Sequence, residues 1–125
     1  LEVVSVAEVQ NDQLWVDYIT RRERIRSDLQ VLHDTEPRAF RQCKTVDTLA
    51  TNLPGPDLAA DLNEVMLFHG TNPIAMESIA TGAFKVNLAG SNTGTLYGRG
   101  IYLGDNCTKG DEYAPPDENG LRTIL

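Results

Sequence analysis

The residues best suited to chemistry in this 125-residue sequence are a histidine, several glycines and three tyrosines in its second half. His69 and Gly70 directly follow residues 65–68, a short apolar run that predicts a buried strand. A histidine ring at the end of such a strand is held in a defined place. Because Gly70 has no side chain, a ligand can approach its N–H and C=O closely. These two groups can pair with the acceptor and the donor of a carboxamide.

The tyrosines add a second part to this candidate site. A tyrosine offers a flat face for stacking a heteroaromatic ring and a hydroxyl that orients polar atoms. The three concerned are Tyr97, Tyr102 and Tyr113. Glycines lie among them and keep the backbone uncrowded: Gly98, Gly100 and Gly104. The spacing predicts a slot for a planar ring that carries a carboxamide. It also fits a structural alternative, with a core tyrosine, turn glycines and a structural histidine.

Periodicity indicates the elements that position these residues. The valine-rich residues 1–10 predict a strand that is moderately buried on both faces. Asn11 or Asp12 can cap a helix that runs to about Leu32. Its apolar residues recur at three- and four-residue steps: Leu14, Trp15, Tyr18, Ile25, Leu29 and Leu32. Arginines that mostly fall off this stripe predict a solvated basic face, with a partner or phosphate site as the alternative: Arg21, Arg22, Arg24 and Arg26.

The remaining elements are expected to be short. Residues 33–63 are poorly patterned, with helical turns expected at 38–43 and 58–62. Pro73 is expected to start a helix that Gly82 caps, followed by a short strand at 84–86 and a loop at 89–94. Residues 97–104 are expected to enter a strand, residues 108–113 to form a helix, and residues 121–125 to begin a strand.

Composition limits the classes of protein and partner. Hydrophobic residues make up 41% and charged residues 23%, so one domain with a packed core is expected. Residues 46–125 hold four Lys or Arg against ten Asp or Glu, which disfavours nucleic acid bound by bulk electrostatics. A nucleotide held by directed hydrogen bonds remains compatible with this charge.

The cysteines and the apolar runs bear on the compartment. Cys43 and Cys107 form no metal or disulfide pattern, and no apolar run reaches the length of a membrane span. We therefore expect an intracellular protein, cytoplasmic or nuclear, with reduced thiols, no metal and no membrane association. Since Leu1 is not a starting methionine, the chain is expected to be part of a longer one.

Three blocks, in order and at compatible spacing, resemble the catalytic domain of the poly(ADP-ribose) polymerase family. That family has a strand ending in His-Gly-Ser/Thr, a Gly-Lys/Arg-Gly-Ile-Tyr-Phe segment and a Ser-Lys-Ser-x-x-Tyr helix. The matching blocks here are residues 67–71, 96–103 and 108–113. Residues 1–23 also resemble the family's entry strand and first helix, so the resemblance covers nearly the whole chain.

The resemblance implies an α+β fold, the ADP-ribosyltransferase fold, with a split antiparallel β-sheet and flanking helices. Residues 1–125 would form the N-terminal and central part of this catalytic domain, without its C-terminal strands and without a regulatory helical domain. Because strands would lack their partners, we expect little independent folding or activity from this part alone. The sequence also lacks a GxGxxG motif after a strand, which would mark the different dinucleotide-binding α/β fold.

The resemblance further implies NAD+ as co-substrate and a role for each matching residue. His69 would bind the ribose next to the adenine, and Gly70 would clamp the nicotinamide carboxamide through its backbone. Tyr113 would stack on the nicotinamide ring, with Tyr102 lining the other side. His69 and Tyr102 are the expected catalytic residues, and residues 84–96 would lie over the dinucleotide. The full set expected to bind NAD+ is His69, Gly70, Thr71, Tyr97, Tyr102, Gly110 and Tyr113.

Position 110 departs from the family pattern. The family's Ser-Lys-Ser is Thr108-Lys109-Gly110 here, and its second serine usually gives its hydroxyl to the carboxamide. Loss of one neutral hydrogen bond, about 0.5–1.5 kcal/mol, would weaken NAD+ binding without abolishing it. The family's third catalytic position lies on a later strand, beyond Leu125, so the residue that bears on mono- or poly-transfer is not in this sequence.

The predicted function is transfer of ADP-ribose from NAD+ to an acceptor with release of nicotinamide. Transfer of single units is preferred, because the loop before Tyr97 is short. The acceptor is expected to be a protein, a nucleic-acid acceptor is not indicated, and the oligomeric state is open. Two alternatives remain. One is an impaired member that binds NAD+ or ADP-ribose without turnover, and the other is an interaction module that uses the arginine-bearing helix or the acidic face.

Overall fold

The computed structural model of the chain describes residues 2–31, 43–45, 58–88 and 97–125. These residues belong to two compact units, one formed by Leu1–Asn11 with Phe68–Leu125 and the other by Asp12–Leu67. Most of the helical turn expected at 38–43 and the whole loop expected at 89–94 lie outside the described residues.

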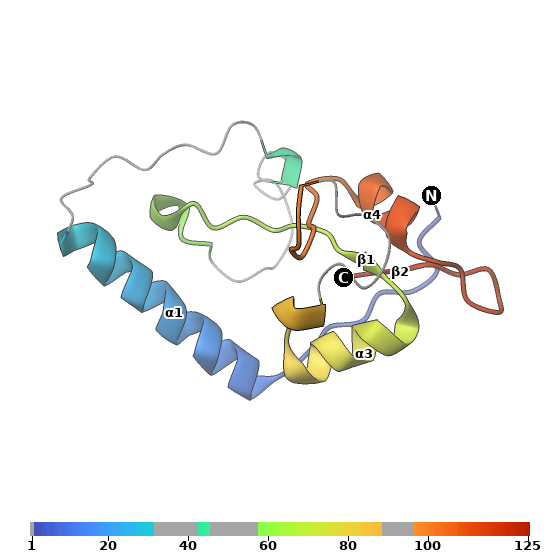
Figure 1. Cartoon of the computed structure of the whole chain (residues 1–125), viewed down its shortest axis with the longest axis horizontal. Coiled ribbons are helices and arrows are strands. Elements are labelled where there is room, and N and C mark those ends of the chain that lie inside the picture. Colours follow the sequence, from blue (N-terminus) through green and yellow to red (C-terminus); the bar gives the residue numbers. More distant parts are fainter. Residues whose placement is uncertain (1, 32–42, 46–57, 89–96) are drawn as a thin grey trace. The chain divides into compact units, whose positions relative to one another are not determined.

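The longest element is helix α1, Asp12–Val31, at the blue end of the colour scale in Figure 1. It confirms the helix predicted after Asn11, although Leu32 lies outside the described residues. None of its residues is fully buried, and Trp15 and Tyr18 stack on one another with ring centroids 5.6 Å apart. Since this helix buries little apolar surface, its polar contacts matter more than usual for holding it in place.

A polar cluster of Tyr18, Arg22 and Glu64 provides such contacts within this unit. The Ala59 N–H donates to Glu64 Oε2 at 2.6 Å, and Arg22 Nη1 lies 3.6 Å from the same oxygen. Burial, together with Glu64, raises the pKa of Tyr18 to about 12. Burial also acts to raise the pKa of Glu64, but hydrogen bonds from Tyr18 and Ala59 and the charge of Arg22 outweigh it and lower that pKa. Glu64 therefore binds α1 as a carboxylate.

The 3₁₀ turn η1, Ala60–Leu62, confirms the short helical turn predicted at 58–62. Asn63 ends it with φ 56°, in the left-handed region that asparagine tolerates better than most residues. Asp61 Oδ2 in this turn lies 3.4 Å from Arg26 Nε. Arg22 and Arg26 thus have acidic partners inside the unit, which weakens the case for a phosphate site at these two positions.

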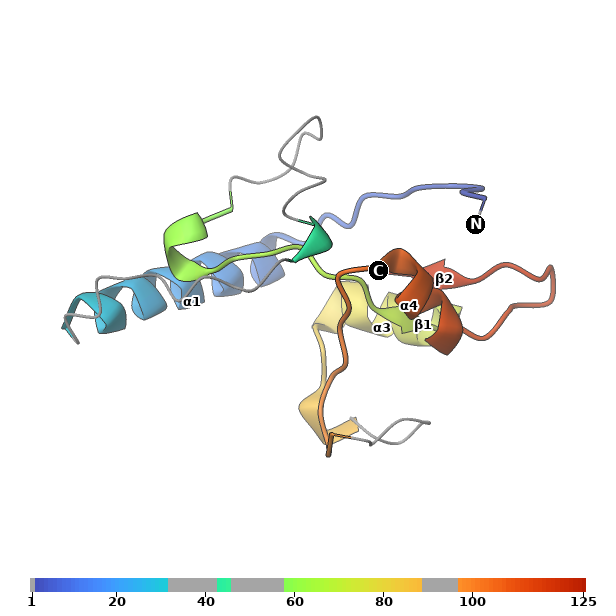
Figure 2. The same cartoon turned by 90° about the horizontal axis from the view of Figure 1, so that it is seen from above.

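The other unit contains a two-stranded antiparallel sheet of β1, Gly70–Thr71, and β2, Thr123–Ile124. Helix α4, Cys107–Tyr113, packs on both strands, and Figure 1 shows helix α3, Pro73–Gly82, on the other side of them. Figure 2 shows the same elements from above. The helix predicted at 108–113 is confirmed, as is the strand predicted at 121–125, which is shorter than expected.

Helix α3 begins where it was predicted and ends one residue later. The Asn72 side chain accepts a hydrogen bond from the Ala75 N–H at 2.8 Å, and Pro73 occupies the first turn. Gly82, the predicted cap, is instead the last helical residue, and Ala83 is the C-cap with φ 64°. With ψ 173°, Ala83 lies in a backbone region that essentially only glycine adopts and that costs a residue with a Cβ about 1–3 kcal/mol, so other contacts must hold this end.

Asn11 supplies contacts at that end of α3. Its Nδ2 donates to the carbonyls of Ala80 at 3.1 Å and Thr81 at 3.2 Å, in the last turn of the helix. The last four carbonyls of a helix lack partners within it, so a side-chain donor there stabilises the end.

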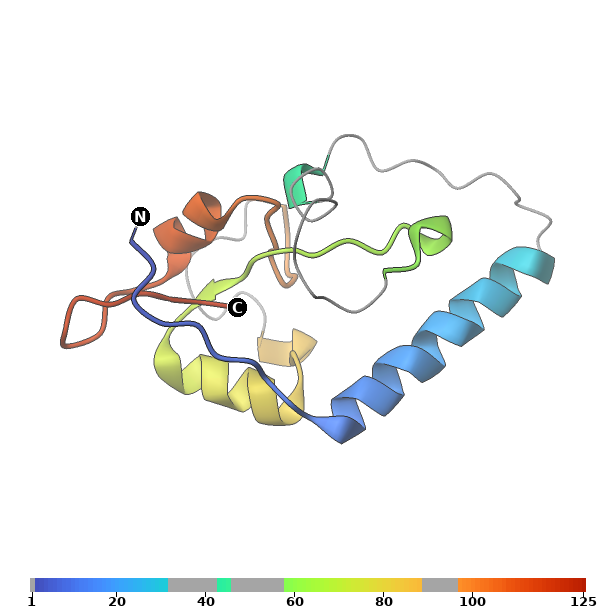
Figure 3. The ribbon, with the colours of Figure 1, turned by 180° about the vertical axis from the view of Figure 1, so that it is seen from behind.

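Three predicted strands are wrong within the described residues. Residues 2–10 are irregular and exposed, with Val3 at 76% and Val6 at 88%, and Figure 3 shows them as a plain extended ribbon. Of the strand predicted at 65–68, residues 65–67 are irregular and Phe68 forms a single bridge, and residues 84–86 lead into the 3₁₀ turn η2, Val86–Leu88. An apolar segment becomes a strand only where its backbone finds a pairing partner. In the described part of the chain, residues 2–10, 65–67 and 84–86 lie in no sheet, and Phe68 has only its bridge to Gly104.

Residues 97–104, expected to enter a strand, form only one bridge, between Gly104 and Phe68.

Two further findings, on membrane spans and on metal ligands, concern the described residues alone. No helix there combines the length and the apolar character needed to cross a membrane. No group of three His, Cys, Asp or Glu residues there is placed to hold a metal ion.

Candidate functional site

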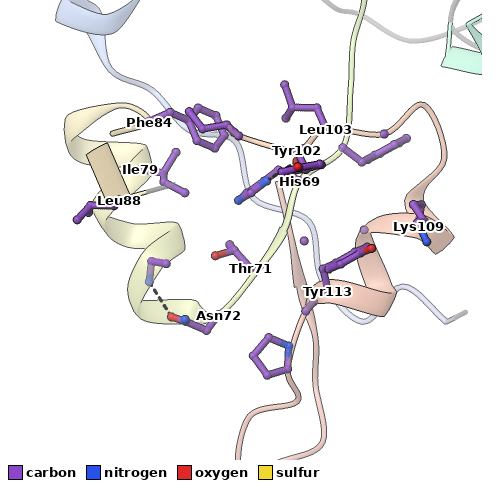
Figure 4. Close-up of a pocket in the computed structure, with 18 of the residues that line it drawn as sticks. His69, Thr71, Asn72, Ile79, Phe84, Leu88, Tyr102, Leu103, Lys109 and Tyr113 are labelled. Carbon is purple, nitrogen blue, oxygen red and sulfur yellow. Dashed lines mark hydrogen bonds between the residues drawn. The ribbon is translucent and has the colours of Figure 1, made fainter. Parts of the chain in front are cut away.

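A cleft of about 1600 Å³ opens beside β1, between α3 and η2 on one side and α4 on the other. Pockets for drug-sized ligands usually measure about 300–1,000 Å³, so this cleft has room for a larger molecule. Figure 4 shows its side chains in three groups: His69 and Tyr102 in the middle, Ile79, Phe84 and Leu88 toward α3, and Lys109 and Tyr113 on α4.

The His69 ring is held in one orientation by the backbone of Tyr102. Its Nδ1 lies 2.9 Å from the Tyr102 carbonyl oxygen, and a carbonyl can only accept, so Nδ1 carries the proton. The edge of the ring packs against Phe84, with centroids 5.0 Å apart and planes at 88°. In the neutral ring, Nε2 is then an acceptor for a ligand hydroxyl.

The Tyr102 hydroxyl is already used by the protein itself. It donates to the Gly98 carbonyl at 2.7 Å and accepts from the Tyr97 N–H at 3.0 Å. Gly98 has φ +92°, which glycine adopts without strain, and this allows the turn to close on the hydroxyl. The Tyr102 hydroxyl and carbonyl therefore hold the turn and His69, and its ring lines the cleft with its centroid 6.4 Å from that of Tyr97.

Gly70 presents its backbone at the edge of β1 that borders the cleft. His69 exchanges both of its backbone hydrogen bonds with Leu125, at 2.9 Å each. Because residues alternate along an antiparallel strand, Phe68 and Gly70 face the opposite edge. Phe68 exchanges both bonds with Gly104 there, at 2.7 and 2.9 Å, but this bridge is a single pair. The N–H and C=O of Gly70 lie beyond this bridge along the same edge, beside the cleft.

Gly70 and Gly110 meet where α4 crosses β1. A Cβ on Gly70 would lie 1.7 Å from the Gly110 carbonyl oxygen, so no larger residue fits there. A Cβ on Gly110 would lie 3.4 Å from the Gly70 nitrogen and 3.3 Å from Ile124 Cγ2. Position 110 is therefore next to the Gly70 N–H, and a small side chain there needs only a slight shift of its neighbours.

Tyr113 is the last residue of α4 and is half-exposed, with its ring toward the cleft in Figure 4. Lys109 Nζ lies 5.1 Å from the centre of this ring and is paired with Glu112, whose hydrogen bond raises the pKa of Lys109 above its usual value. The ammonium group thus stays charged beside an aromatic face.

The seven residues expected to bind NAD+ all line this one cleft, in different ways. Thr71 is buried in β1 at 8% exposure, whereas Tyr97 is exposed at 87%. Two contacts in the cleft were not predicted: the packing of Phe84 on His69 and the bonds of Arg122 to α4. Phe84 itself begins the segment 84–96 that was expected over the dinucleotide, of which residues 89–96 lie outside the described residues. Arg122 gave no signal because it binds backbone carbonyls, which every residue type carries.

Comparison with known proteins decides the family. The family model described as the poly(ADP-ribose) polymerase catalytic domain matches residues 1–125. The chain belongs to the poly(ADP-ribose) polymerase catalytic-domain family. This confirms the resemblance, and the match spans both compact units. The family implies an ADP-ribosyltransferase fold, with which the described helices and the small antiparallel sheet are compatible.

Three curated members of the family are similar over about half of the chain. Mouse (Mus musculus) "Protein mono-ADP-ribosyltransferase PARP10" is 35% identical over 50% of this chain and 7% of its own length. Human (Homo sapiens) "Protein mono-ADP-ribosyltransferase PARP14" is 34% identical over 50% and 4%. "Poly [ADP-ribose] polymerase tankyrase" of Caenorhabditis elegans is 33% identical over 52% and 3%. The aligned part is thus a small fraction of each relative, and no solved structure matches the chain.

The bonds of the Tyr102 hydroxyl predict a local effect of Tyr102→Phe in this family member. Without the hydroxyl, the turn at residues 97–100 loses two hydrogen bonds and should open more often. Trypsin should then cleave after Arg99 roughly three- to tenfold faster than in the unmodified protein. Cleavage after Arg24, in α1, is the internal control and should not change. An unchanged rate after Arg99 would show that the hydroxyl does not hold the turn.

Proposed function

We propose that the protein is an ADP-ribosyltransferase that binds NAD+ in this cleft and transfers ADP-ribose to an acceptor with release of nicotinamide. The observation that carries the proposal is the position of the Gly70 N–H and C=O, at an open strand edge beside the cleft. A carboxamide has one acceptor and one donor group side by side, and these two backbone groups complement it. A carboxylate or an ester lacks the donor.

The residues around Gly70 suit the rest of NAD+. Tyr113 and Tyr102 come from different segments and offer ring faces to the nicotinamide ring. His69, with Nδ1 held by Tyr102, has Nε2 left to accept a ribose hydroxyl. Directed bonds of this kind bind a nucleotide without a basic surface, which agrees with the net charge of −7.

The reaction breaks the bond between nicotinamide and ribose. Its transition state has oxocarbenium-ion character, as in glycoside hydrolysis, and nicotinamide leaves with the bonding electrons. His69 and the Gly70 edge would act by holding the two halves of NAD+ in a reactive geometry. An acceptor nucleophile then attacks the anomeric carbon and loses its proton.

We also propose that the protein transfers single ADP-ribose units to a protein acceptor. Two of the three relatives are named mono-ADP-ribosyltransferases, which supports this choice, although the third is named a polymerase. The alternative, a member that binds NAD+ without turnover, is favoured by one observation. Gly110 leaves the carboxamide without the hydroxyl that the family's serine provides.

Nicotinamide release, measured with and without His69, tests both the proposed transfer activity and the assignment of the site. In the protein incubated with NAD+, His69→Ala should lower kcat/KM for nicotinamide release about three- to tenfold, because the ribose loses a hydrogen-bond partner. Glu77→Ala, at an exposed position of α3, is the matched control and should behave like the unmodified protein. Binding of NAD+ without nicotinamide release would support the inactive member. Equal rates for His69→Ala and the unmodified protein would contradict the site.

Gly110→Ser should restore the missing hydroxyl. Gly110→Ala is the matched control, since both variants place the same Cβ near Ile124 and Gly70 and only serine adds an oxygen. Calorimetry should show NAD+ binding about three- to tenfold tighter for serine than for alanine. Equal affinities would mean that position 110 does not face the carboxamide.

A further inference from the structure

Helix α4, which carries Gly110 and Tyr113, is weak by itself. It has seven residues, far below the length at which an isolated helix is stable in water. A glycine in its middle costs about 1 kcal/mol relative to alanine. Asn106 caps its start by accepting from the Thr108 N–H at 3.0 Å. The other end, where Tyr113 sits, needs support from outside the helix.

Arg122 provides that support. Its Nη1 donates to the Asp111 carbonyl at 3.1 Å and to the Ala114 carbonyl at 2.5 Å, and its Nε lies 3.7 Å from Asp111 Oδ1. These carbonyls flank Tyr113 in sequence. The C-terminal end of a helix also favours a cation, because its free carbonyls carry partial negative charge. Ala114, at 1% exposure, anchors the same point by burial.

The connection between α4 and β2 holds Arg122 in place. Asp117 Oδ1 accepts from the N–H groups of Asn119 and Leu121 at 2.8 Å each, and the Asp117 N–H donates to the Leu121 carbonyl at 2.8 Å. The chain is therefore folded back tightly just before Arg122. Thr123, which follows, pairs with Thr71 in β1. Arg122 thus links the end of α4 directly to the strand pair.

We propose that Arg122 is a positioning residue that holds the Tyr113 ring in place for the nicotinamide ring. This inference rests on the proposed function. Arg122 also lines the cleft, so a direct contact with the phosphates of NAD+ is the competing explanation. Nicotinamide alone separates the two, because it has a ring to stack and no phosphate to bind.

The test compares Arg122→Ala, Arg122→Lys and the unmodified protein. Arg122→Ala should raise the Kd of nicotinamide and the KM of NAD+ by the same factor, about five- to tenfold. The kcat should stay within about twofold, because Arg122 touches no reacting atom. Arg122→Lys, which keeps a cation and its donors, should recover part of the loss. Arg24→Ala, which removes an arginine from α1, should change none of these values.

Two results would overturn the proposal: a weaker KM for NAD+ with unchanged nicotinamide binding, or no change in either. A further measurement tests the role of Arg122 independently of the proposed function. Amide hydrogen exchange at Tyr113 and Ala114 should be faster in Arg122→Ala, whether or not NAD+ is a substrate. If the unmodified protein binds neither ligand, the proposed function fails. Unchanged exchange at these two amides would then overturn the role of Arg122 as well.

Discussion

Helix α4 and strand β1 meet at two glycines, and the arrangement of the cleft depends on that close approach. With 1.7 Å between the place of a Cβ on Gly70 and the Gly110 carbonyl oxygen, any side chain at position 70 would push the helix away. The approach sets Tyr113 near the strand edge that presents the Gly70 N–H and C=O. One residue without a side chain thus serves both the packing of the helix and the access of a ligand to the backbone.

Several polar groups of the cleft are bonded within the protein, which fixes the few that remain for a ligand. Tyr102 uses its carbonyl on His69 and its hydroxyl on the turn at residues 97–98. Arg122 binds the carbonyls at the end of α4. A site whose groups are already ordered before the ligand binds loses less conformational entropy on binding. The Gly70 edge and His69 Nε2 then set which ligand chemistry fits.

Local patterns in the sequence predicted the elements whose own residues determine them. Helices α1 and α3 follow from apolar spacing and from Pro73, and all three helices, α1, α3 and α4, were predicted to within one or two residues. The valine-rich residues 2–10 show the limit, because a strand exists only through a partner elsewhere in the chain. For the same reason a strand was expected on the apolar run before His69, whereas the pairing with residues 123–125 begins at His69 and strand β1 itself is Gly70–Thr71.

In the candidate site, too, one part was predictable from the sequence and another was not. The residue types and the family pattern brought His69, Gly70, Tyr102 and Tyr113 together, and all four line the cleft. Their hydrogen-bond partners were not predictable. The Tyr102 carbonyl that fixes the His69 ring and the carbonyls that hold Arg122 belong to the backbone, whose chemistry does not vary with sequence. Only the folded chain brings these groups within reach.

The most direct test of the account is the amide resonance of Gly70 in a nuclear magnetic resonance titration with nicotinamide and, separately, with nicotinic acid. Nicotinamide should shift this resonance strongly, because the ligand carbonyl accepts from the Gly70 N–H while its amide donates to the Gly70 C=O. Nicotinic acid should shift it far less, since its carboxylate has no donor and meets the Gly70 carbonyl oxygen. A Gly70 resonance that does not move with nicotinamide, or that moves equally with both ligands, would contradict a carboxamide clamp at this strand edge.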